Sequence, residues 1–129
     1  MNRTKAREYA FVLLFEYKFQ PSEMESILSD FIEEFQPGAQ QEYIERVVRG
    51  AVQNIDAIDG IIDGVSNEWK VERISCVSIA VLRLAVYEMQ YDDDIPVGVA
   101  IDEAVELSKR FGQESSGAFV NGILAALAG

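Results

Sequence analysis

The sequence predicts an all-α fold, a compact bundle of about six or seven helices. Apolar residues recur at three- and four-residue steps along almost the whole chain, which is the spacing of a buried helix face. No segment alternates apolar and polar residues as strands do, and no Asn-Gly or Asp-Gly turn separates two β-rich runs. The chain has 129 residues, of which 49% are hydrophobic, so we expect one ordered domain over residues 1–129.

The first two helices are marked by their ends. The first begins among the cations of the opening stretch and ends before Pro21. Ser22 is expected to cap a second helix over residues 22–35, which ends at the Gln-Pro-Gly segment 36–38. The apolar face of the first helix is formed by Ala6, Ala10, Leu13, Leu14 and Tyr17.

A longer third helix is predicted over residues 44–65, where apolar residues keep the helical spacing. Glycines inside it weaken the helix and allow a neighbouring helix to approach closely. They are Gly50, Gly60 and Gly64.

A polar stretch at residues 66–74 predicts a turn anchored by Trp69. The segment 74–91 that follows is apolar on nearly every face, which is typical of a central helix surrounded by others. The turn therefore predicts two subdomains, at about residues 1–66 and 67–129.

The last part of the chain predicts two more helices. An acidic loop ends the central helix, and Pro96 suits the first turn of a helix over residues 97–111. A Gly-Gln-Glu-Ser-Ser break precedes the final helix, over residues 117–129.

Composition excludes several classes of site. The chain has no histidine, so a Ser/His/Asp triad, a Cys/His pair and a His-ligated zinc site are excluded. Its one cysteine, Cys76, lies among apolar residues and is expected to be a buried, inert thiol. No signal peptide and no apolar run of 18 residues is visible, so we expect a cytoplasmic protein without cofactor or metal.

Carboxylates do not make a convincing catalytic site. Asp102 and Glu106 share a helix face, and Asp92, Asp93 and Asp94 form a run. A chain with 22 carboxylates produces such spacings by chance, so solvated acidic surfaces are expected here rather than a metal site.

The opening stretch is basic although the net charge is −11. Arg3, Lys5 and Arg7 stand at the start of a helix, where the macrodipole favours anions rather than cations. One interpretation is an exposed, solubilising terminus. The other is a phosphate clamp, which aromatic rings on the same helix support by stacking on bases, unless they pack in the core. These rings are Tyr9, Phe11, Phe15 and Phe19.

Arg83 stands alone inside an apolar helix. A cation in such a place is rarely unpaired. It is expected either to brace the bundle through a carboxylate or to contact a partner at a groove.

Four segments together resemble the NusB transcription antitermination factor family. They are KAREYAFVLLFEY at 5–17, VVRGAVQNIDAIDGII at 47–62, the long segment AVLRLAVYEMQYDDDIPVGVAIDEAVELSKRF at 80–111, and FVNGIL at 119–124. The resemblance runs essentially from end to end. It implies two packed three-helix subdomains, no enzymatic activity, and binding to single-stranded boxA leader RNA of ribosomal RNA operons.

The resemblance also implies partners and site residues. NusE, a small-subunit ribosomal protein, is the expected partner, together with other Nus factors and RNA polymerase, while a homodimer is left open. Charge complementarity to a basic ribosomal protein, rather than the resemblance, leads us to expect this partner at the acidic Asp92, Asp93, Asp94 and Asp102, with Arg83. The expected RNA-binding residues are Arg3, Lys5, Arg7, Phe15, Phe119, Asn121 and Gly122.

Alternatives stay open at this point. The fold could serve as a protein–protein adaptor without an RNA site, or as a carboxylate metalloenzyme. Phe119, Ile123 and Leu127 also repeat as a core stripe would, so the Phe119 ring is expected either in the core or against a base.

Overall fold

The computed structural model describes residues 1–66 and 71–129, and within them the fold is entirely helical, which confirms the all-α prediction. Short 3₁₀-helices at Pro21–Glu23, Gly38–Gln40 and Val71–Arg73 lie between longer helices. The seven α-helices of the described ranges are α1 Arg3–Phe19, α2 Met24–Phe35, α3 Gln41–Gln53, α4 Ile55–Val65, α5 Cys76–Tyr91, α6 Val97–Phe111 and α7 Ser116–Ala128.

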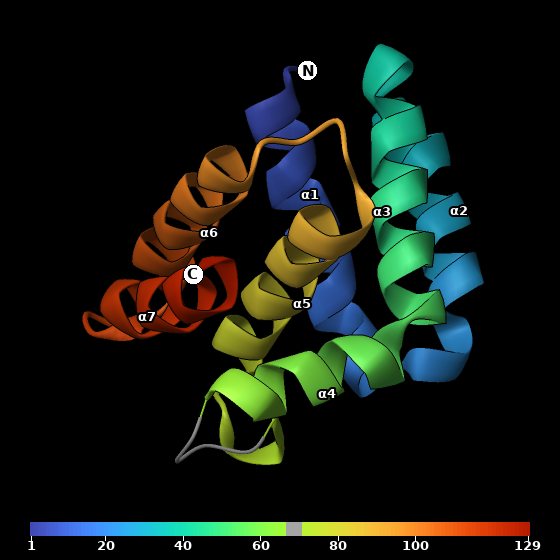
Figure 1. Cartoon of the computed structure of the whole chain (residues 1–129). Coiled ribbons are helices and arrows are strands. Elements are labelled where there is room, and N and C mark those ends of the chain that lie inside the picture. Colours follow the sequence, from blue (N-terminus) through green and yellow to red (C-terminus); the bar gives the residue numbers. More distant parts are fainter. Residues whose placement is uncertain (67–70) are drawn as a thin grey trace.

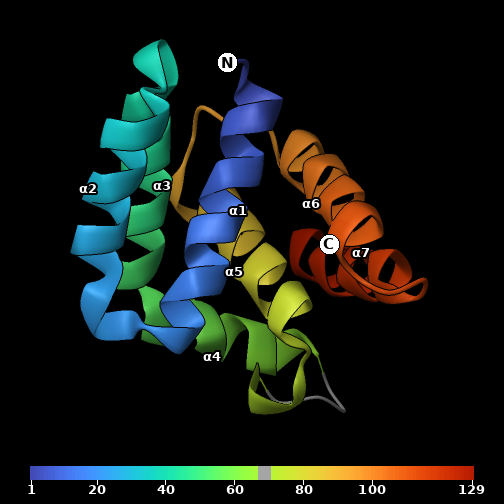
Figure 2. The same ribbon diagram turned by 180° about the vertical axis from the view of Figure 1, so that it is seen from behind.

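Helices α1 and α5 form the centre of the bundle (Figure 1). α2 and α3 lie on one side of this pair, and α6 and α7 lie on the other. α4 crosses near one end of the bundle, where it packs against α5 and α7 (Figure 2). The prediction that segment 74–91 is central is confirmed, because every residue of α5 from Ser78 to Glu88 is buried.

The predicted long helix over residues 44–65 is wrong, because it is divided at Asn54. The Asn54 backbone leaves the helical region at φ −109° and ψ 21°, and its side-chain Nδ2 donates to the carbonyl of Gly50 at 2.8 Å. Asparagine side chains compete with helical hydrogen bonds in this way. The break turns α4 across the bundle instead of letting α3 continue past it.

Helix starts follow the predictions only in part. Ser22 lies inside the first 3₁₀-helix and does not cap α2, and Pro96 stands just before α6 rather than inside its first turn. α5 has a side-chain cap, since Ser75 Oγ accepts from the Ser78 amide at 3.2 Å. Trp69 lies outside the described residues, and the division into subdomains at about residues 1–66 and 67–129 stays a prediction.

Alanine substitutions at two glycines, Gly60 and Gly50, distinguish the effect of helix propensity on stability from the effect of packing. A methyl group at Gly60 would meet no other atom within 4 Å, and alanine favours a helix over glycine by up to about 1 kcal/mol. We expect Gly60→Ala to raise the free energy of unfolding in urea by about 0.5–1 kcal/mol. Gly50→Ala is the control, because its methyl would overlap the Tyr87 ring of α5, so it should gain less or lose stability. Equal stabilisation by both would contradict close packing of α3 on α5.

Candidate nucleic-acid interface

The first turn of α1 presents two of the three predicted cations to solvent. Arg3 Nε donates to Gln40 Oε1 at 2.8 Å, and the Arg3 guanidinium lies 4.1 Å from the centroid of the Tyr43 ring. Lys5 Nζ lies 2.9 Å from Glu8 Oε2. Within the described part of the chain, Arg3 pairs with no carboxylate, so its charge is available to an anion.

The third cation, Arg7, is not exposed, so the expectation that it contacts RNA together with Arg3 and Lys5 does not fit the structure. Only 3% of Arg7 is accessible to solvent. Its Nε and Nη2 donate to both carboxylate oxygens of Glu88 on α5 at 2.9–3.1 Å, and Tyr43 OH donates to the same carboxylate at 3.1 Å. Arg7 Nη1 lies 3.5 Å from Glu103 Oε1. Arg7 therefore holds α1 against α5 rather than facing a ligand.

Arg7 is buried because its ion-pair partner, Glu88, lies inside the bundle. Glu88 interrupts an otherwise apolar helix, and a carboxylate buried there requires a cation and hydrogen bonds. Burial raises the pKa of Glu88 above its usual value, while Arg7 and Tyr43 oppose that rise. For Arg7, burial opposes the charged form, but hydrogen bonding to Glu88 raises its pKa, so it stays protonated. Glu88 was the signal in the sequence that could have predicted this pair.

A row of phenylalanine rings connects α1 with the end of α6. Phe15 is half-buried, and its ring centroid lies 5.3 Å from that of Phe19, whose surface is 57% exposed. Phe11, which is buried, lies 6.4 Å from Phe15 and 5.3 Å from the exposed Phe111. Arg110 covers the Phe111 ring at 5.0 Å. Phe111 and Arg110 were not among the predicted site residues.

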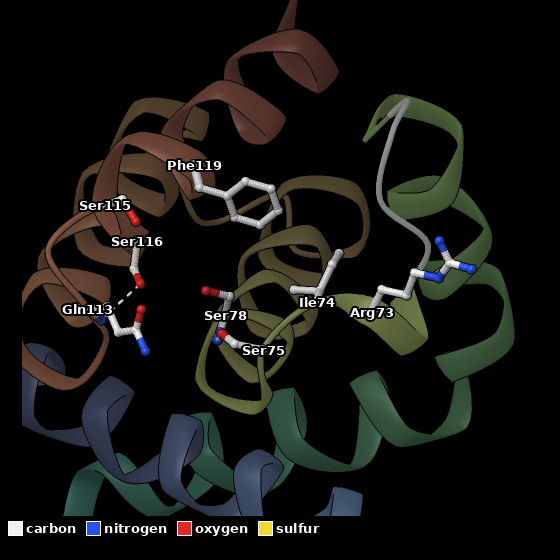
Figure 3. Close-up of a pocket in the computed structure, with 8 residues that line it drawn as sticks. All are labelled: Arg73, Ile74, Ser75, Ser78, Gln113, Ser115, Ser116 and Phe119. Atoms are coloured by element: carbon white, nitrogen blue, oxygen red, sulfur yellow. Dashed lines mark hydrogen bonds between the residues drawn. The ribbon is translucent and has the colours of Figure 1, made fainter.

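Phe119, at the start of α7, is neither fully buried nor fully exposed. It packs partly against the core, and it also lines a surface cavity (Figure 3). The inward positions of α7 are taken by Val120, Ile123 and Leu124. Asn121 and Gly122 are exposed on the same helix. A core position for Phe119, as its spacing with Ile123 and Leu127 suggested, therefore accounts for only part of its surroundings.

Two residues expected to contact a protein partner are occupied inside the fold. Arg83 Nε and Nη2 donate to the two carboxylate oxygens of Asp59 on α4 at 2.9 Å, which confirms its bracing role. Asp92 is buried and lies 3.0 Å from Arg46 Nη2 of α3. Both charges therefore have partners inside the fold, and contact of Arg83 and Asp92 with a protein partner stays a prediction. The other three predicted acidic residues, Asp93, Asp94 and Asp102, are exposed.

No cluster of three or more acidic or cysteine side chains that could hold a metal ion occurs among residues 1–66 and 71–129. Cys76 is half-buried in the first turn of α5 rather than fully buried as predicted. None of the helices in the described ranges has the length and apolar character needed to cross a membrane.

Comparisons with known proteins cover nearly the whole chain. The family model of the NusB family matches residues 4–129. The transcription antitermination protein NusB of Thermoanaerobacter sp. (strain X514) is 43% identical over 126 residues, which is 98% of this chain and 89% of that protein. The protein of the same name from Acetivibrio thermocellus is 45% identical over 125 residues, which is 96% of this chain and 86% of that protein.

Solved structures agree with the sequence relatives. T. maritima NusB superposes with a TM-score of 0.92 at 40% identity, covering 99% of this chain and 91% of that one. A crystal structure of antitermination factors NusB and NusE in complex with dsRNA gives a TM-score of 0.86 at 29% identity, covering 98% of this chain and 97% of that one.

The buried ion pair can be tested by stability. Arg7→Met leaves Glu88 buried without its cation, and breaking a buried pair costs about 3–5 kcal/mol of unfolding free energy. We expect that loss in urea denaturation, and we expect Arg7→Met/Glu88→Leu to recover most of it, because apolar residues replace both charges. Arg3→Met is the control and should cost at most about 1 kcal/mol, as exposed charges do. Similar losses for Arg7→Met and Arg3→Met would show that the pair is not buried.

Proposed function

The chain belongs to the NusB family, and from that premise we propose that it is a transcription antitermination factor that binds boxA-type single-stranded leader RNA together with NusE. The observation that carries the RNA-binding part is Arg3, which stays without a carboxylate among the described residues of a chain with 22 acidic and 11 basic residues. A cation without a carboxylate partner in such excess negative charge favours an anionic ligand.

The proposed RNA surface combines phosphate contacts with base contacts. Arg3 and Lys5 are proposed to neutralise phosphates, and the half-buried rings of Phe15 and Phe119 to stack on bases. Asn121 and Gly122 lie exposed beside Phe119, where a base edge and the RNA backbone can approach. Arg7 is left out of the contact surface and is proposed to position α1.

Single strands suit this surface better than a duplex. Rings stack on bases only where the bases are unstacked from one another, and A-form duplexes are recognised mainly by shape. The related complex of NusB and NusE contains double-stranded RNA. Binding should therefore be measured with both a single strand and its duplex.

NusE is proposed to bind a different surface, in the second half of the chain. Asp93 and Asp94 stand in the exposed loop between α5 and α6, and Asp102 is exposed on α6. Negative charge there is complementary to a basic ribosomal protein. We also propose that the chain acts with other Nus factors and RNA polymerase in ribosomal RNA operons, and that it does so in the cytoplasm. No reaction is assigned to the chain.

A protein–protein adaptor without an RNA site is the second candidate. The exposed acidic surface around Asp94 favours it, because that surface can act without RNA. The candidates differ in salt dependence, since phosphate contacts on a single strand give a log–log slope of about −0.7 for each phosphate. An adaptor shows no saturable RNA binding.

Phe119→Ala tests the base contact. Loss of a stacked ring should weaken boxA RNA binding by about 1–3 kcal/mol, measured by fluorescence anisotropy. Phe35→Ala is the matched control, because Phe35 is a 45% exposed phenylalanine on α2, and RNA affinity should not change. Urea denaturation accompanies both variants, and a large stability loss in Phe119→Ala with unchanged affinity per folded molecule would place the ring in the core.

Charge reversal tests the separate NusE surface. Asp93→Lys/Asp94→Lys should weaken NusE binding at least several-fold by like-charge repulsion, with boxA RNA affinity not reduced, as measured by calorimetry. Asp30→Lys/Glu33→Lys makes the same charge change on exposed positions of α2 and should leave NusE binding unchanged. An equal effect of both pairs would mean that only net charge matters.

A further inference from the structure

A groove of about 360 Å³ lies between α1 and α2, on the face of the bundle that Figure 2 shows. The two helices lie side by side there, while α6 and α7 lie on the other side of α1. One stripe of each helix lines the groove, with residues at three- and four-residue steps. The stripes are Tyr9, Val12, Leu13 and Glu16 of α1, and Ile27, Asp30, Phe31, Glu34 and Phe35 of α2.

The floor and walls of this α1–α2 groove are apolar and aromatic. Leu13 and Phe31 belong to the core beneath it and are almost fully buried. The rings of Tyr9, Phe31 and Phe35 contact one another, with centroids 4.9–5.2 Å apart, and yet Phe35 is 45% exposed. A large ring that its neighbours hold in place and that still faces solvent offers a partner apolar area at a small cost in side-chain entropy.

The rim of the groove is acidic. It carries Glu16 of α1 with Asp30 and Glu34 of α2, and none of the residues that line the groove is basic. None of these three carboxylates forms an ion pair with a side chain of the described ranges. Lys5 lies near one end of the groove, but its Nζ is already paired with Glu8 at 2.9 Å. The groove therefore presents three unpaired negative charges around an apolar floor.

The charge of the rim decides which occupant fits. A symmetric dimer through this groove would bring two acidic rims together, and like charges that face each other oppose association. RNA and anionic membrane surfaces are repelled for the same reason. A basic segment is complementary in both respects, because its apolar side chains cover the rings while its cations meet the carboxylates. An arginine of such a segment can also stack on the exposed ring of Phe35.

The length of the groove fits a helix. From Ile27 to Phe35 the lining stripe extends about 12 Å along α2, which is about two turns. Asp30 and Glu34 are four positions apart, so their carboxylates follow each other by about 6 Å, as do two basic residues at i and i+4 of a helix lying along α2. Amphipathic helices bind such grooves through apolar anchors at i, i+3, i+4 and i+7.

We propose that the α1–α2 groove docks a basic amphipathic helix of a partner protein. The groove is a third surface of the chain, beside those proposed for RNA and for NusE. On α1, Phe15 belongs to the row of rings that leads to α6, whereas Tyr9 and Val12 face α2. The exposed Asp93 and Asp94 stand in the loop between α5 and α6, which does not line the groove. The inference does not rest on the proposed RNA-binding function.

A synthetic helix serves as the probe. It has about 14 residues, or four turns, with Leu and Phe at the anchor spacing and Lys and Arg elsewhere. A second peptide has the same composition in scrambled order. Titration of the isotope-labelled chain with the first peptide should shift the amides of Val12, Glu16, Asp30 and Phe35 until saturation, and the scrambled peptide should not. The affinity should fall as the salt concentration rises, because exposed charges are screened.

Matched variants separate the rim from the floor. Glu34→Lys should weaken peptide binding at least about five-fold by like-charge repulsion. Glu33→Lys is its control, because Glu33 is an exposed neighbour on α2 that does not line the groove, and the affinity should change by less than about two-fold. Phe35→Ala should weaken binding about ten-fold, as loss of an aromatic anchor does. Phe19→Ala removes another exposed ring, outside the groove, and should leave the affinity unchanged.

The remaining outcomes contradict the inference in different ways. No binding, equal affinity for both peptides, or equal effects of Glu34→Lys and Glu33→Lys would overturn it. Shifts of the groove amides that grow with protein concentration alone would show that a second copy of the chain occupies the groove. Loss of peptide binding once NusE or boxA RNA is bound would make the groove part of one of those surfaces. Peptide binding by a chain that binds no RNA would leave this inference standing and overturn the proposed function.

Discussion

The buried ion pair between Arg7 and Glu88 is the interaction on which the arrangement of the two central helices depends. It joins α1 to α5, and Tyr43 adds a hydrogen bond from α3. A pair with bidentate geometry fixes how far α1 slides and turns against α5, because any shift leaves charges buried without partners. That register leaves Lys5 exposed, and it leaves Arg3, about one turn before the buried Arg7, exposed as well.

The chain divides its charges between structure and surface. Arg83 with Asp59 attaches α4 to the central helix, and Arg46 with Asp92 attaches the start of the acidic loop to α3. These pairs use cations inside a fold that has few of them. Among the described side chains, Arg3, Lys18 and Arg73 have no carboxylate partner, and Arg3 stands where we propose a phosphate contact.

The spacing of apolar residues predicted those features of the fold that depend only on which residues are buried. The central position of α5 followed from apolar residues on every face. Phe119 was expected either in the core or against a base, and its half-buried position leaves that choice a prediction. Pairing between distant segments could not be predicted in the same way, because Arg7 and Glu88 are 81 positions apart. The break at Asn54 was missed for another reason, since apolar spacing continues through it and only the asparagine side chain marks the turn.

The central claim is that RNA binds along α1 and the start of α7, where Arg3 and Lys5 present charge and Phe15 and Phe119 present half-buried rings. Photo-crosslinking of the protein to boxA RNA, followed by mass spectrometry of the cross-linked peptides, tests this most directly. The account predicts cross-links in the peptides that contain Phe15 and Phe119. Cross-links confined to α2 and α3 would contradict it.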